Sequence, residues 1–332
     1  MKISGAGEFA LIKQVSRCFE SLLPKGATGI GDDCAVLPKN AAEVYIVSCD
    51  MLLDGVHFYK DKISPYDLGY KSLAVNLSDI AAMGGAANIA SFLSLAVPPE
   101  TNMRWIKNFF AGYKSLAEKH GVALCGGDMS AYTGVMINVT VMGTAKKNRL
   151  RFRNTAKVGD VICCTLPLGD SAGGFRLIQQ SSIRGKAEEF LINAHYRPAP
   201  ELAAAVCLAG MDGVHAMMDI SDGLISDLQR ITSASGCGAV INTEDLPISQ
   251  QLKVTSDKYG WDTTDLAVNG GEDYCLLFTA DAANIKRILA RFEKQTGRPF
   301  YIIGGITKEK GRIRLIKNGK KIKNPGTVFK HF

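Results

Sequence analysis

Residues 29–36 of the chain read Gly-Ile-Gly-Asp-Asp-Cys-Ala-Val, which places two adjacent carboxylates in a run that is otherwise glycine and apolar residues. Aspartate is rarely buried unless something compensates its charge. Because carboxylate oxygens are ligands that Mg²⁺ prefers, a divalent cation is one partner for this pair. A turn that caps a strand explains the same eight residues equally well. The stretch alone therefore leaves a turn and a metal site as alternatives.

Acidic residues in glycine-rich or apolar surroundings recur along the chain. Each one alone is also explained as a helix cap or a turn residue. Gathered in one pocket, however, they would repel one another and raise one another's pKa values. Divalent cations neutralise such a pocket, and a polyphosphate completes the coordination, as in phosphoryl transfer. The set comprises Asp32, Asp33, Asp50, Asp79, Asp128, Asp219, Asp222 and Glu272.

Several common nucleotide-binding and catalytic motifs are missing from the sequence. It contains no GxxxxGK[ST] and no GxGxxG, and it lacks the HRD and DFG elements of protein kinases, GxSxG and HExxH. A nucleotide would therefore be held through metal ions and glycine-rich turns. Gly126–Gly127 and Gly169–Gly174 are the candidates for close backbone approach to phosphates.

Length and composition favour a globular protein of two domains. The chain has 332 residues, of which 46% are hydrophobic and 21% charged. Its net charge of +7 comes partly from lysines near the C-terminus, which we interpret as a solvated face because no nucleic-acid motif accompanies them. Nine scattered cysteines without a CxxC pair indicate reduced thiols packed as small hydrophobic residues. Without a signal peptide or an apolar span, we expect a cytoplasmic protein that binds neither nucleic acid nor membrane.

Both halves alternate helix-like and strand-like segments, so the predicted fold class is mixed α/β. Strand-like Val44–Cys49 ends before Asp50, and Ser64 followed by Pro65 predicts a helix start. A second strand, Ala123–Cys125, is expected to end at the glycines before Asp128. The basic, polar stretch Lys146–Arg153 marks the predicted boundary. We expect a metal- and ATP-binding domain at 1–148 and a domain contributing ATP and substrate contacts at 149–332.

A series of strings along the chain resembles the thiamine-monophosphate kinases. This family belongs to the superfamily of aminoimidazole ribonucleotide synthetase and selenophosphate synthetase. The most specific strings are VNLSDIAAMG at 75–84 and GGEDY at 270–274. The others are GIGDDCAV at 29–36, DGVHF at 54–58, GGD at 126–128, LGDSA at 168–172 and DISDGL at 219–224. The resemblance extends from Glu8 to about Phe329.

The resemblance implies phosphorylation of thiamine monophosphate to thiamine diphosphate, by direct in-line transfer from ATP with several Mg²⁺ ions. It also implies a homodimer in which the N-terminal sheets of two protomers pair. The implied metal positions are Asp33, Ser48, Cys49, Asp50, Asp79, Asp128, Asp219 and Asp222. The implied ATP contacts are Gly127, Asp128, Arg153 and Ser221. The implied substrate contacts are His57, Glu272 and, as an aromatic near the C-terminus, Phe329.

The chain departs from the family pattern at two positions. Cys49 stands where a hydroxyl residue is usual, and Met129 ends a string that usually closes with threonine. Since Mg²⁺ prefers oxygen, one metal position is expected to be weaker or filled by water. Two alternatives stay open: another ATP-dependent synthetase of the superfamily, and a non-catalytic protein that binds nucleotide or thiamine phosphate. Selenophosphate synthetase is disfavoured because it needs a reactive cysteine or selenocysteine in an N-terminal glycine-rich loop, and no cysteine precedes Cys18. The hydrogenase-maturation relatives are disfavoured because they end in a cysteine, whereas this chain ends in His331-Phe332.

Overall fold

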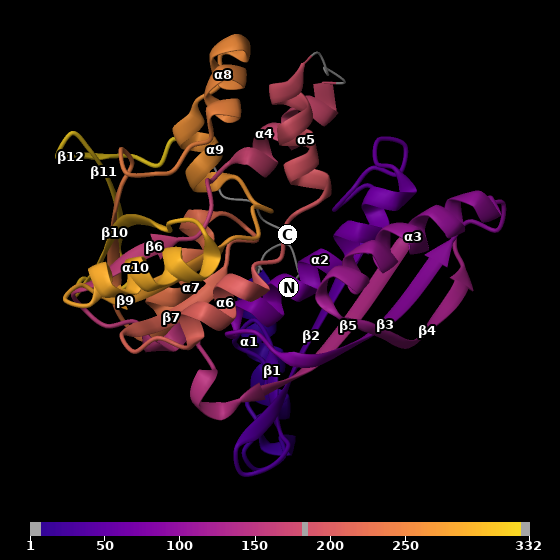
Figure 1. Cartoon of the computed structure of the whole chain (residues 1–332), viewed down its shortest axis with the longest axis horizontal. Coiled ribbons are helices and arrows are strands. Elements are labelled where there is room, and N and C mark those ends of the chain that lie inside the picture. The colour runs from indigo at the N-terminus through magenta and orange to yellow at the C-terminus, as the bar shows by residue number, and fades with distance from the viewer. Residues whose placement is uncertain (1–7, 181–184, 327–332) are drawn as a thin grey trace.

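The computed structural model describes residues 8–180 and 185–326, which form two sheets with helices packed against them (Figure 1). The N-terminal sheet has the strand order β1-β2-β5-β3-β4. The β3–β4 pair is parallel and the other pairs are antiparallel, so the sheet is mixed. Its strands are β1 (Ala35–Pro38), β2 (Glu43–Leu53), β3 (Ala87–Val97), β4 (Ala123–Ala131) and β5 (Met136–Lys146).

Helices α2 (Pro65–Ala82) and α3 (Met103–His120) lie together on one face of this sheet (Figure 1). Helix α2 begins as predicted, because Ser64 accepts a hydrogen bond from the N–H of Asp67 and Pro65 occupies the first turn. Side chains of β2 alternate between the faces, so Ser48 is buried beneath α2 whereas Cys49 is exposed on the opposite face. We call that opposite face the open face.

The C-terminal sheet has seven strands in the order β12-β11-β8-β10-β6-β9-β7, with one parallel pair, β11–β8. Its strands are β6 (Asp160–Cys164), β7 (Val214–Asp219), β8 (Gly238–Asn242), β9 (Leu276–Asp281), β10 (Tyr301–Thr307), β11 (Ile313–Lys317) and β12 (Lys320–Ile322). Its helices are α4 (Asp170–Gln180), α5 (Lys186–Tyr196), α6 (Leu202–Ala209), α7 (Leu224–Ser235), α8 (Gln250–Tyr259), α9 (Thr263–Asn269) and α10 (Ile285–Thr296).

Helix α2 belongs to the cores of both domains. Leu73 and Leu77 pack into the N-terminal core, whereas Ala81 packs with residues of α6, α10 and the C-terminal sheet, such as Phe278. The two sheets confirm the predicted mixed α/β class with two domains. Between the sheets, the basic stretch forms two short 3-10 helices, η3 (Lys147–Arg149) and η4 (Arg153–Thr155). The division at residues 148 and 149 stays a prediction.

Two strands are longer than predicted. Strand β2 continues through Asp50 to Leu53, and β4 continues through the glycines and Asp128 to Ala131. The β4 strand can continue because Gly127 adopts φ +156° against β3, where a Cβ atom would lie 1.8 Å from the carbonyl oxygen of Leu93. Both aspartates therefore project from within strands rather than from the loops that follow them.

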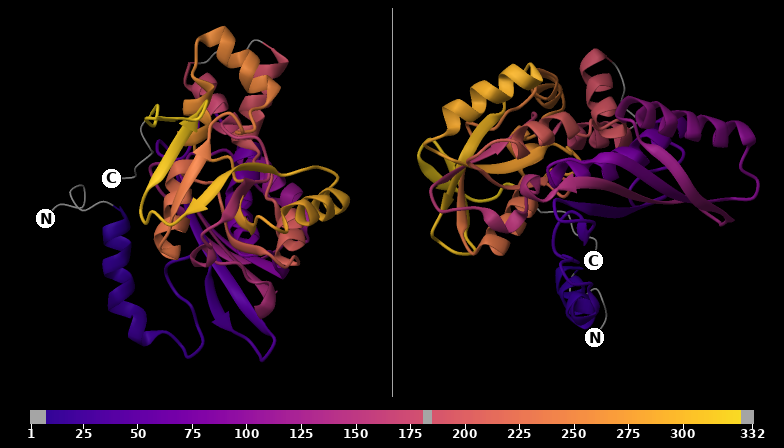
Figure 2. Two further views of the ribbon diagram at one scale, coloured as in Figure 1. Left: turned by 90° about the vertical axis from the view of Figure 1, so that its left-hand side faces the viewer. Right: turned by 60° about the horizontal axis from the view of Figure 1, so that its bottom comes forward.

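Helix α1 (Glu8–Phe19) and the 3-10 helix η2 (Glu20–Leu22) project from the body of the protein (Figure 2). Phe19 and Leu22 are exposed there. All nine cysteines are free, as predicted, but Cys18, Cys49 and Cys125 are exposed rather than packed in the core. No helix within 8–180 or 185–326 is long and apolar enough to cross a membrane.

Candidate metal and substrate site

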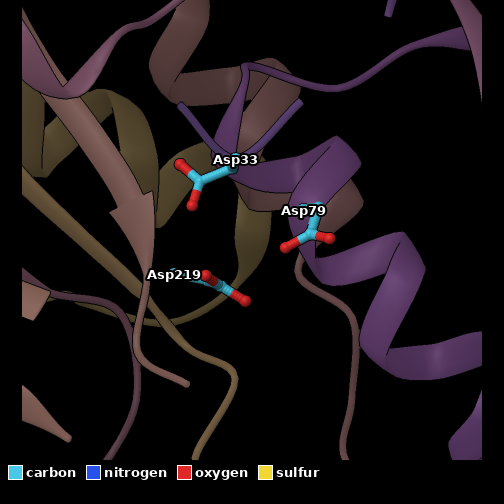
Figure 3. Close-up of side chains that lie close together, drawn as sticks. All are labelled: Asp33, Asp79 and Asp219. Atoms are coloured by element: carbon cyan, nitrogen blue, oxygen red, sulfur yellow. The ribbon is translucent and has the colours of Figure 1, made fainter. Parts of the chain in front are cut away.

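Three carboxylates from distant parts of the sequence meet between the two domains. Asp33 comes from the loop before β1, Asp79 from α2 and Asp219 from the end of β7. One oxygen of each lies within 4.8 Å of the others, and Figure 3 shows the side chains turned toward a common space. We call these residues the carboxylate cluster.

Side chains of α2 and β2 orient the cluster. Ser48 donates a short hydrogen bond to Asp79, and Ser78 Oγ lies 2.5 Å from Asp219 Oδ2. The N–H of Asp50 donates to Asn76 Oδ1 at 3.2 Å, which ties β2 to the same helix. Polar side chains of α2 thus reach both domains: Asn76 contacts β2, and Ser78 contacts Asp219 at the end of β7.

The electrostatics of the cluster favour a bound cation. Burial and the neighbouring Asp33 raise the pKa of Asp219 to about 7. Burial, Asp50 and Asp219 raise the pKa of Asp79 well above its usual value. Asp33 Oδ2 is buried and has no hydrogen-bond partner among the described residues. One buried and two half-buried carboxylates, of which Asp33 has an unsatisfied oxygen, are a donor set that fits Mg²⁺, because the cation would remove their mutual repulsion and satisfy that oxygen.

Two arginines form ion pairs with carboxylates in and beside the cluster. Arg153 of η4 contacts Asp33 at 2.5 Å and Asp32 at 3.3 Å, and its N–H donates to Asp32 Oδ2. Asp32 also accepts from the N–H of Asp33, so it holds the turn. On the other side, Arg230 of α7 forms a short ion pair with Asp222. These guanidinium groups lie where phosphate oxygens could replace the carboxylates as their partners.

Asp227 fixes the loop that carries Ser221 and Asp222, and the sequence analysis missed it. Its Oδ2 accepts hydrogen bonds from the N–H groups of Ser221, Asp222 and Gly223 at 3.0, 3.1 and 3.1 Å. The side chain is fully buried in the first turn of α7. An aspartate in the first turn of a helix was the signal that could have found it.

A pocket of about 750 Å³ opens beside the cluster, between α2 and the helices of the C-terminal domain. Asp50, Asp79 and Asp222 line it on the metal side. The predicted substrate contacts His57 and Glu272 line it as well. The structure therefore brings the candidate metal ligands and the candidate substrate contacts to one cavity.

The loop that carries Glu272 is joined to the loop that carries Ser221. The N–H of Glu272 donates to Ser221 O at 2.7 Å, although Glu272 has φ +64°, a conformation that non-glycine residues rarely adopt. The Glu272 carboxylate contacts Lys71 at 3.0 Å and His195 at 3.1 Å. The sequence analysis missed both Lys71 and His195. A lysine among the mostly apolar and small residues of the predicted helix was the available signal for Lys71.

Four predicted site residues do not join the cluster within one chain. Cys49 is exposed on the open face and contacts Asn138 and Thr140. Gly127 and Asp128 lie on β4, the edge strand, where every residue is exposed. Phe329 lies outside the described residues. These placements leave the family roles of the four residues as predictions.

Comparisons with known proteins identify relatives along the whole chain. The AIR synthase related protein N-terminal domain matches residues 31–145, and the C-terminal domain of that description matches residues 157–316. Thiamine-monophosphate kinase of Buchnera aphidicola subsp. Schizaphis graminum is 36% identical over 331 residues, 98% of each chain. The Escherichia coli K12 thiamine-monophosphate kinase is 35% identical over 332 residues, again 98% of each. The solved structure of AaThiL complexed with AMPPCP and TMP is 30% identical with a TM-score of 0.85, covering 100% of this chain and 99% of that one.

Proposed function

Because the chain belongs to the thiamine-monophosphate kinases of the AIR synthase-related superfamily, we propose how its own residues carry out that reaction. The protein phosphorylates thiamine monophosphate with ATP. One observation carries the assignment of residues: Asp79 belongs both to the carboxylate cluster and to the wall of the pocket that Glu272 lines. Phosphate chemistry and substrate recognition therefore share one cavity.

The carboxylate cluster, with Asp50 and Asp222 beside it on the pocket wall, is the proposed site of the Mg²⁺ ions. When bound, Mg²⁺ supplies charge neutralisation and orientation of the phosphates during transfer. Ser48 and Ser78 hold Asp79 and Asp219 in place for this task through their short hydrogen bonds.

Arg153 and Ser221 are the proposed ATP contacts within the same chain. Arg153 offers a guanidinium group to phosphate oxygens, and Asp227 holds the Ser221 loop in a fixed conformation. Glu272 and His57, which both line the pocket, are the proposed contacts to thiamine monophosphate, with Glu272 accepting hydrogen bonds from the aminopyrimidine. The substrate's phosphate is already anionic, so its oxygen attacks the γ-phosphorus in line without a general base, while the bond from the γ-phosphorus to the bridging oxygen breaks and ADP leaves.

The N-terminal sheet supports a homodimer with shared sites. The open face and the edge strand β4 expose large apolar side chains, including Phe92, Leu124 and Met129. An exposed edge strand with apolar side chains is a surface that a second chain can cover. Asp128 faces the same side as Ser94, its partner on β3, and not the side covered by α2. Pairing of two such sheets would let Asp128 of one chain complete the carboxylate cluster of the other.

Mixing two inactive variants tests this shared site. If Asp79 and Asp128 act from opposite chains, a dimer of Asp79→Asn with Asp128→Asn has one intact site. Random reassortment of the two variants should then recover about a quarter of the wild-type activity per chain. If both residues act within one chain, the mixture stays as inactive as either variant alone, which would reject the shared site. Light scattering of the unmixed proteins measures the oligomeric state.

Release of ADP with thiamine monophosphate as acceptor tests the proposed function itself. We expect turnover that requires Mg²⁺ and stops with EDTA. Nucleotide binding without turnover would favour the non-catalytic alternative. Within one chain, Cys49 lies on the open face and replaces no member of the carboxylate cluster.

A further inference from the structure

The pocket wall that carries Glu272 rests on a group of buried polar side chains that the proposed reaction does not use. Lys71 of α2 is 0% exposed, and its Nζ lies 3.0 Å from Glu272 Oε2. His195 of α5 is also buried, with Nδ1 3.1 Å from the same oxygen and Nε2 3.4 Å from Lys71 Nζ. Ser171 Oγ lies 3.0 Å from His195 Nδ1. We call Lys71, His195 and Ser171 the anchor group.

The contacts of the anchor group show which nitrogen of the His195 ring carries the proton. An ammonium group only donates, so Lys71 donates to Glu272 Oε2 and to His195 Nε2. Nε2 then carries the lone pair and Nδ1 carries the proton, which faces Glu272 Oε2 and Ser171 Oγ. Burial and the Lys71 charge lower the pKa of His195 to about 3, in agreement with a neutral ring. The imidazole therefore gives the carboxylate a hydrogen bond without a second positive charge.

Both contacts use Oε2 of Glu272, so Oε1 is the oxygen that can accept hydrogen bonds from a ligand in the pocket. The backbone of Glu272 has φ +64°, which costs on the order of 1–2 kcal/mol for a residue with a Cβ atom. A residue is held in such a conformation only when its surroundings fix it. Here Lys71 fixes the side chain from the N-terminal domain, and Ser221 fixes the backbone.

We propose that Lys71 is a positioning residue for substrate recognition, which holds the Glu272 carboxylate so that Oε1 faces the aminopyrimidine in the pocket. This inference rests on the proposed function, in which Glu272 contacts thiamine monophosphate. Lys71 and Asp79 are both carried by α2, two turns apart. Helix α2 therefore sets the spacing between Lys71, which holds Glu272, and the carboxylate cluster.

The change Lys71→Met tests the proposal, because it keeps the length of the side chain and removes its charge. We expect kcat/KM for thiamine monophosphate to fall by roughly tenfold or more, since a hydrogen bond to a charged group is lost. The KM for ATP should stay unchanged. The matched control is Lys62→Met, because Lys62 Nζ also crosses the domain interface, donating to Ile178 O at 2.8 Å, without contacting Glu272. The control should change neither constant, and Lys71→Arg should recover part of the loss.

The pH profile separates positioning from a general loss of structure. Burial raises the pKa of the Glu272 carboxyl, but Lys71 and His195 lower it by more than burial raises it. The pKa of Glu272 therefore lies below its usual value. In Lys71→Met the acid limb of kcat/KM for thiamine monophosphate should therefore move to higher pH, whereas the profile for ATP should not. The ionisable groups that face Glu272 are Lys71 from α2, His195 from α5, His57 from the loop after β2, and Asp273 and Tyr274 from its own loop. Equal loss for both substrates, or an unmoved acid limb, would overturn the role of Lys71.

A double variant keeps the proposal testable if Lys71→Met does not fold. Lys71→Met/Glu272→Gln removes both charges, so no unpaired carboxylate is buried. Calorimetry with thiamine monophosphate should show that it binds as weakly as Glu272→Gln alone. Additive losses would instead show that Lys71 acts independently of Glu272. A wild-type enzyme without turnover would reject the proposed function before any variant is compared, whereas wild-type turnover with unchanged variant constants rejects only the role of Lys71.

Discussion

Replacing Asp219 with asparagine tests whether the carboxylate cluster is held together at an electrostatic cost. Asp219 is 2% exposed, and burial together with Asp33 raises its pKa from 3.8 to about 7. Such a group contributes stability that is present below the unfolded pKa and is lost as the pH rises through the folded pKa. The difference of about 3 pKa units is worth up to about 4 kcal/mol at pH 8.

In the metal-free protein at pH 8, Asp219→Asn should therefore raise the free energy of unfolding by up to about 4 kcal/mol. At about pH 5 the folded wild-type carboxyl is already protonated, so the gain should shrink to about 2 kcal/mol or less. Asparagine keeps an oxygen for the Ser78 hydroxyl, so the hydrogen bond to that residue is retained. Urea denaturation in EDTA at both pH values measures the difference.

At pH 8, Mg²⁺ should make the wild type more stable to unfolding than Asp219→Asn, the reverse of their order in EDTA. In the proposed site Mg²⁺ binds the ionised carboxylates, so it should stabilise the wild type more at pH 8 than at pH 5, and should stabilise Asp219→Asn much less. Asp257→Asn, at an exposed position of α8, is the control and should change neither quantity. A variant that is less stable than the wild type at pH 8 in EDTA, or that keeps the full stabilisation by Mg²⁺, would refute the reasoning.

Three further changes follow from the same geometry. Ser78→Ala removes the donor to Asp219 and should weaken Mg²⁺ binding by about 10- to 100-fold in a calorimetric titration, with kcat falling at limiting metal. Asp227→Ala leaves three N–H groups of the 221–223 loop without their acceptor, so unfolding should cost about 3 kcal/mol less and the KM for ATP should rise; an unchanged KM would contradict the role of this loop. Gly127→Ala should lower the melting temperature by several degrees, because its Cβ would meet Leu93 O at 1.8 Å, whereas Gly126→Ala, with its nearest neighbour at 3.4 Å, should be tolerated.

Local signals in the sequence were enough for the class of fold and for the family. Helix α2 begins at Pro65 because Ser64 caps it and Pro65 suits the first turn, and both features depend on residues close in sequence. The strings at 75–84 and 270–274 indicated a thiamine-monophosphate kinase, and the comparisons confirm this. The chemistry of aspartate in apolar surroundings was also local, so the candidate metal ligands could be named before their positions were known.

Tertiary structure alone decided which of these residues meet. Three aspartates converge because α2, β7 and the loop before β1 pack together, and no local pattern encodes that packing. The face on which Cys49 and Asp128 lie follows from the alternation of side chains along β2 and β4, whose lengths depend on pairing with distant strands. The pair of Lys71 and Glu272 joins residues 201 positions apart. Residues 29–36 illustrate both parts: the sequence predicts a turn or a metal site, and in the structure Asp32 holds the turn while Asp33 belongs to the carboxylate cluster.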